Sequence, residues 1–183
     1  MSGSRSTARR RRGWSPAARG ALVAWLLGLV LLALTALWLL ADLPWYSKLA
    51  GWVLLVWLAD ECGGWFGYVA AILGAAPFFS GLIGYGPDAP VQWAVAYPLV
   101  LVGLIGALLV KHAGGPLLLP VALALLVAPI FVARFVGPSL DTGITLPGIP
   151  RFLDSTLWPG LLGAAVSLAV AIIRRARRRT VRA

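Results

Sequence analysis

The stretch that decides the fold is LAGWVLLVWLADECGGWFGYVAAILGAAPFFSGLIGYG, residues 49–86. It is apolar throughout except for the DECGG segment at residues 60–64. As a single helix it would be about 57 Å long, too long for one crossing of a hydrocarbon core about 30 Å thick. Two acids followed by two glycines are typical of a turn, because glycine readily adopts positive φ. We therefore predict a short helix from about Trp45 to Ala59 and a longer one from about Trp65 to Tyr85.

The composition of the whole chain indicates a membrane protein. Of its 183 residues, 60% are hydrophobic and 12% are charged, whereas globular chains carry roughly 25% charged residues. A soluble domain of this size could not bury so much apolar surface, and a disordered chain is poor in hydrophobic residues. The single cysteine, Cys62, excludes a disulfide framework. We expect an all-α, polytopic integral membrane protein.

Four further apolar runs have the length of a membrane crossing, which takes about 20 residues. They are Gly20–Ala41, Val91–Val110, Pro116–Val136 and Leu157–Ile173. The first run, about 22 residues long, exceeds the roughly 7–15 residues of a signal-peptide core. Together the runs predict a compact bundle of six transmembrane helices over residues 20–173, with a short second helix. The alternative treats that short helix as re-entrant, which leaves five spans.

Arginine clusters at both ends of the chain predict its orientation. Six arginines lie in the tail of residues 1–19 and six more in the tail of residues 174–183. Lys and Arg near the ends of spans stay on the cytoplasmic side of the membrane. Six crossings place both tails in the cytoplasm and leave only Lys48, Arg134 and Arg151 outside, whereas five crossings would separate the clusters. Charge therefore favours six, with an external loop over residues 137–156 that folds back on the bundle as a lid.

The same tails predict what the protein contacts. Each basic residue near a membrane surface contributes roughly 1 kcal/mol of attraction to anionic headgroups, so we expect anionic lipid at both tails rather than nucleic acid. Usage rich in arginine and alanine is typical of a GC-rich prokaryote, which makes the plasma membrane the expected location. We also expect a membrane-protein partner or a homo-oligomer.

A ridge of small residues predicts how the third helix packs. Its members are spaced four residues apart: Gly63, Gly67, Ala71 and Ala75. Helices associate in a bilayer through close approach and interhelical hydrogen bonds, which small residues permit. We expect this ridge to meet another helix of the bundle, and a contact with a partner protein is the alternative.

Ionisable residues inside a membrane are the default functional candidates, because burying them is costly. The main ones here are Asp60 and Glu61. In the simpler interpretation they are hydrated carboxylates at a cytoplasmic turn, and in the alternative they lie in a partly desolvated pocket. Lys111 and His112 fall at the same membrane face and could pair with them.

The inventory of reactive residues predicts no catalytic residue, cofactor or metal. One histidine and one cysteine do not assemble a catalytic zinc set, which usually has three protein ligands. The chain also carries no nucleophile elbow, P-loop or dinucleotide fingerprint.

Three functions follow from these observations. The first is a non-catalytic subunit or scaffold of a membrane complex, supported by the small-residue ridge, the short loops and the scarcity of buried polar groups. The second is a substrate-binding or transport component for a small solute. In length and topology alone, the chain is similar to the substrate-binding subunits of energy-coupling-factor vitamin transporters. Its pocket would then open externally, with Trp45, Tyr85 and Trp158 near the mouth. The third is an intramembrane enzyme that uses Asp60, Glu61 or His112.

The topology is testable with reporter fusions. A phosphatase that is active only outside the cytoplasm should be inactive when fused at either end of the chain, because both arginine clusters stay inside. As a control, the same reporter inserted between residues 137 and 156 should be active. A phosphatase active at one end of the chain and inactive at the other would contradict an even number of crossings.

Overall fold

The computed structural model describes residues 15–77, 91–140, 146 and 148–180. Every element within these ranges is a helix, so the all-helical fold class is confirmed. The elements are α1 (Pro16–Leu40), α2 (Trp45–Cys62), α3 (Gly64–Leu73), α5 (Val91–Gly114), the short 3₁₀ helix η1 (Gly115–Leu118), α6 (Leu119–Leu140) and α7 (Ile149–Thr180).

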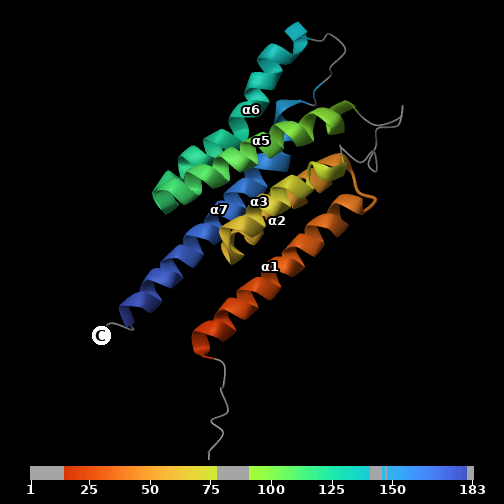
Figure 1. Ribbon diagram of the computed structural model, residues 1–183. Helices are drawn as coiled ribbons and strands as arrows, with labels where there is room; N and C mark the ends of the chain where they lie inside the picture. The colour runs from red at the N-terminus through yellow and green to blue at the C-terminus, as the bar shows by residue number, and fades with distance from the viewer. Residues whose placement is uncertain (1–14, 78–90, 141–145, 147, 181–183) are drawn as a thin grey trace, which may run out of the picture.

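Three described helical stretches are long and apolar enough to cross a membrane: residues 16–40, 94–139 and 149–179. The middle stretch is the continuous run of α5, η1 and α6. It folds back on itself near Gly115, whose φ of +64° lies in the left-handed region that glycine adopts without strain. As a result α5 and α6 lie side by side as a hairpin (Figure 1). These lengths and compositions agree with residence in a membrane.

The centre of the bundle is α2, which packs against α1, α3, α5 and α7. Its side chains Trp52, Val53, Val56 and Trp57 are fully buried. The ring of Trp52 stacks on that of Tyr97 in α5, with centroids 4.9 Å apart and an interplanar angle of 7°. The indole Nε1 of Trp52 donates a hydrogen bond to a backbone carbonyl of α3 at 2.9 Å. The helix expected to be short therefore lies at the centre of the described bundle.

The break after α2 falls later than the sequence predicts. The helix continues through Asp60 and Glu61 to Cys62, so it has 18 residues and a length of about 27 Å. The chain turns at Gly63, whose φ of 163° is extended. Neither glycine of the pair uses the left-handed conformation that the turn prediction invoked. The two acids stay helical because α5 supplies partners for their side chains, as the next subsection describes.

The small-residue ridge lies inside the bundle. Gly67, Ala71 and Ala75 are buried, and Gly63 is half-buried at the turn. A Cβ added at Gly67 would lie 2.7 Å from the Cβ of Asp60, so α3 approaches α2 as closely as backbones permit. The ridge therefore joins two helices of the same chain.

The later helices are longer than expected. α5 runs on to Gly114, and α7 begins at Ile149. Residues 137–140 and 149–156 of the connection predicted over residues 137–156 are thus helical, and Phe152, assigned to a lid, is instead buried in α7 against Trp45. The prolines and glycines of this stretch suggested a loop, but Pro150 sits in the first helical turn, where proline is tolerated. The expected extension of the third helix to Tyr85 lies outside the described residues.

The α5–α6 contact predicts that alanine substitutions at two glycines of α5 change the free energy of unfolding by different amounts. A Cβ at Gly103 would lie 2.8 Å from the carbonyl oxygen of Leu126 in α6, whereas at Gly106 it would meet only a methyl carbon of Leu125, at 4.0 Å. We expect Gly103→Ala to push the helices apart and cost roughly 1–3 kcal/mol. Gly106→Ala should be neutral, or stabilising by up to about 1 kcal/mol through helix propensity. Unfolding free energies in detergent micelles check this, and equal effects would contradict the contact.

Candidate functional site

The polar site lies at one end of the bundle, where the C-terminal ends of α2 and α5 meet α7. Asp60 and Glu61 stand in the last turn of α2. Lys111 and His112 stand in the last turn of α5, just beyond the end predicted at Val110. The longer helices therefore carry both pairs of side chains to the same place.

The four side chains form one network of ion pairs and hydrogen bonds. Lys111 Nζ pairs with Asp60 Oδ2 and, at 2.5 Å, with Glu61 Oε1. The other carboxylate oxygen of Asp60 lies 2.6 Å from His112 Nε2. The Asp60 side chain is fully buried, and those of Lys111 and Glu61 are 13% exposed, whereas that of His112 is 42% exposed. Asp60 is thus the centre of the network and His112 its edge.

Two further contacts hold this network in place. The Lys111 ammonium lies 5.3 Å from the centroid of the Trp57 ring, within the range of a cation–π interaction. Trp57 itself packs on Gly163 of α7, where a Cβ would lie 2.4 Å from the Trp57 Cβ. Arg174 of α7 donates a hydrogen bond through Nη2 to the backbone carbonyl of Glu61 at 2.8 Å. This bond satisfies one of the carbonyls that the end of a helix leaves without an intrahelical donor.

The network borders a cavity of about 250 Å³. The residues that line it come from α2, the α5–η1–α6 run and α7: Asp60, Glu61, Lys111, His112, Gly115, Pro116, Leu119, Ser167, Ala171 and Arg174.

One lining residue, Ser167, carries a buried hydroxyl without a hydrogen bond. Ser167 is only 4% exposed, and its hydroxyl has no hydrogen-bond partner among the described residues. The buried hydroxyls of Thr35, Ser155 and Thr156 behave differently, because each donates to the carbonyl four residues earlier in its own helix. A buried hydroxyl without a partner costs free energy, so Ser167 is an unusual residue in the wall of the cavity.

The aromatic residues predicted to surround an external pocket do not line this cavity. Trp45 is half-buried and contacts Phe152, with ring centroids 6.4 Å apart. Trp158 is 61% exposed on α7, and Tyr85 lies outside the described residues. This cavity lies instead at the end of the bundle where Arg174 and the predicted acid–base cluster lie.

Sequence reasoning missed Ser167, Trp57 and Arg174 as parts of the site. A signal for two of them was present in α7, where small residues recur every three or four positions from Gly160 to Ala171 and lead to Arg174. Residues at that spacing share one face of a helix, so Ser167 and Arg174 share a face.

A second cavity, of about 520 Å³, lies between α1, α2 and α7. Its lining is apolar or small, and none of it is charged: Leu34, Trp38, Ser47, Ala50, Gly51, Leu54, Leu55, Pro159 and Leu162. The indole of Trp38 donates to the backbone carbonyl of Ser47 at 3.1 Å and so closes one side. This cavity is therefore lined mainly by apolar side chains.

The chemistry of the first cavity is that of charge and hydrogen bonding. Within the described ranges, no three His, Cys, Asp or Glu side chains are arranged to hold a metal ion. Comparison with models of protein families, with curated proteins and with solved structures found no match to this chain. The site's role must therefore be inferred from its own residues.

The ion pairs predict strong coupling between Lys111 and Asp60. Lys111→Met leaves two carboxylates without their shared cation, and breaking a buried pair costs about 3–5 kcal/mol. Adding Asp60→Asn should recover part of that loss, so that the double variant is more stable than the sum of the single effects predicts. Arg175→Gln, at an exposed position of α7, serves as the control and should change stability by less than about 0.5 kcal/mol. Additive effects in a double-mutant cycle, measured by unfolding in micelles, would contradict the pairing.

Proposed function

We propose that this protein is a plasma-membrane protein with six crossings, both ends in the cytoplasm, and a binding site for a small polar solute at its cytoplasmic end. It would act as the binding or transport component for that solute.

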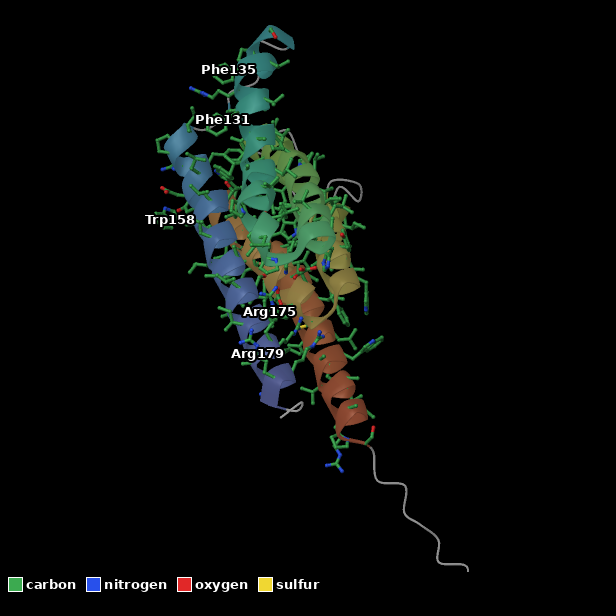
Figure 2. All side chains as sticks on the ribbon, turned by 90° about the vertical axis from the view of Figure 1, so that its left-hand side faces the viewer. Phe131, Phe135, Trp158, Arg175 and Arg179 are labelled. Atoms are coloured by element: carbon green, nitrogen blue, oxygen red, sulfur yellow. The ribbon has the colours of Figure 1, made fainter. Side chains whose placement is uncertain are left out.

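The lengths and ends of the helices support this arrangement. α1 and α7 have 25 and 32 residues, or about 38 and 48 Å, which is ample for a crossing. Figure 2 shows Phe131 and Phe135 towards one end of the molecule and Arg175 and Arg179 towards the other. An arginine-rich end is expected in the cytoplasm. The polar cavity lies at that end, so its solute would be exchanged with the cytoplasm and not beneath an external lid.

The observation that carries the proposal is a fully buried, ion-paired carboxylate beside a cavity. Moving each charge out of water costs several kcal/mol, and well-packed apolar residues are often at least as stabilising as a buried ion pair. Elsewhere the core is apolar, with Trp52, Val53 and Val56 at its centre. Stability alone does not require Asp60 and Lys111 in this bundle. Binding of a polar solute would account for the presence of these two residues beside the cavity.

The alternative functions have less support from the site. The subunit or scaffold interpretation relied on the small-residue ridge and on a scarcity of buried polar groups. In the structure the ridge joins α3 to α2 of the same chain, and buried polar groups are present at Asp60 and Ser167. For catalysis, the Nε2 of His112 lies against Asp60, and no described contact joins that imidazole to a hydroxyl or thiol nucleophile. Binding is therefore the function that the geometry supports best.

Ligand-induced stabilisation tests this function. Small ammonium, carboxylate and polyol solutes, compared at equal ionic strength, should include at least one class that raises the melting temperature of the purified protein in lipid nanodiscs. A solute at 100 times its dissociation constant adds about 2.7 kcal/mol, or a few degrees for a chain of this size.

Two variants on α7 control the experiment. Ser167→Leu fills the cavity and should abolish the stabilisation. Ala165→Leu, on the exposed face of the same helix, should keep it. If no solute class distinguishes the wild type from Ser167→Leu, the proposed binding function is wrong.

A further inference from the structure

We infer that the solute carries a primary ammonium group, and that the Lys111 ammonium occupies the binding position of that group in this conformation. The inference rests on the proposed binding function and names the chemical class of its ligand.

The surroundings of Lys111 Nζ define an ammonium site. Two carboxylates contact it, Asp60 through Oδ2 and Glu61 through Oε1, and the Trp57 ring lies 5.3 Å away. Charged hydrogen bonds from N–H to carboxylates are roughly twice as strong as neutral ones, and an aromatic face attracts a cation. Every one of these neighbours favours a positive donor, so the position suits an alkylammonium group from any source.

The acidic end of α2 is a favourable place for a cation. α2 ends beside the cavity, and the C-terminal end of a helix carries a partial negative charge. Asp60 and Glu61 add two carboxylates at one such end, which is unfavourable unless a cation is close. Two further basic side chains line the cavity: Arg174 donates to the Glu61 carbonyl, and His112 contacts Asp60.

The cavity beside Lys111 indicates an organic ligand and not a bare ion. Its volume of about 250 Å³ is several times that of one water molecule, about 30 Å³ in the liquid. Ser167, a small residue of its wall, leaves this space open.

Exchange of one ammonium for another keeps the site neutralised. Lys111 lies in the last turn of α5, partly exposed, on a flexible stem. When a ligand ammonium takes its place, the Lys111 side chain swings to solvent, and both carboxylates keep a cation. A neutral or anionic molecule cannot replace Lys111 without leaving buried charge unpaired, a state that is strongly disfavoured. The lysine thus acts as a tethered competitor that only cations displace.

The first test asks whether a soluble ammonium compound can replace a truncated Lys111 side chain. Lys111→Ala removes a three-carbon chain and its ammonium, so n-propylammonium supplies the same group. We expect n-propylammonium chloride to recover more than half of the melting temperature that Lys111→Ala loses in nanodiscs. Propan-1-ol and propionate, tested at equal ionic strength, should recover none of it. Lys111→Met, which fills the same space with an apolar chain, should not respond to n-propylammonium.

The second test uses the wild-type protein, in case Lys111→Ala fails to fold. The chain has two lysines, Lys48 and Lys111, so acetylation of Lys111 can be measured by mass spectrometry relative to Lys48. n-Propylammonium should raise this ratio several-fold, because it displaces Lys111 into solvent, whereas propan-1-ol and propionate should not.

The outcomes separate the two proposals. An unchanged labelling ratio, together with no recovery of any Lys111→Ala protein that folds, overturns the ammonium assignment. If carboxylates or polyols alone stabilise the wild type while failing on Ser167→Leu, the binding function stands and the ammonium assignment falls. If no solute class stabilises the wild type, the binding function itself fails.

Discussion

The ion pair between Asp60 and Lys111 is the interaction on which the polar end of this bundle depends. It joins the last turns of α2 and α5, and its carboxylate is fully buried. Removing these charges from water is costly, so the neighbouring groups are arranged around them. His112 contacts the second carboxylate oxygen, the Trp57 ring faces the ammonium, and Arg174 donates to a carbonyl at the end of α2. Without the ammonium, two acids would lie at a helix end that disfavours them.

Close approach of backbones brings these groups within reach of one another. Lipid tails are as apolar as leucine, so helices in a bilayer gain little from burying apolar surface and rely on contact at small residues. Here Gly67 lets α3 lie on Asp60, Gly163 lets α7 lie on Trp57, and Gly103 lets α5 lie on the backbone of α6. The glycines thus set the spacing of the helices, and that spacing sets the geometry of the charged network.

Hydropathy and charge predict the helical class and the course of α1, because these follow from where apolar runs begin and end. They also put Asp60 and Lys111 at the same membrane face, but the simpler interpretation, hydrated carboxylates at a turn, is wrong for Asp60, whose side chain is fully buried. The end of α2 was not predictable in the same way. Two acids and two glycines favour a turn locally, and only tertiary pairing keeps Asp60 in the helix. The start of α7 at Ile149 was hidden by nearby prolines and glycines. The spacing of small residues along α7 places Ser167 on the same face as Arg174, but the missing hydrogen bond of its hydroxyl was not predictable, because a serine in an apolar helix ordinarily bonds its own backbone.

The left-handed turn at Gly115 has a consequence for the synthesis of the protein. α5, η1 and α6 form an unbroken helical run, 46 residues of which are long and apolar enough for membrane insertion, and the turn leaves almost no loop between α5 and α6. In the proposed six-span arrangement, so short a connection would keep the two arms next to each other during insertion. Lys111 would then reach its acidic partners as part of a hairpin.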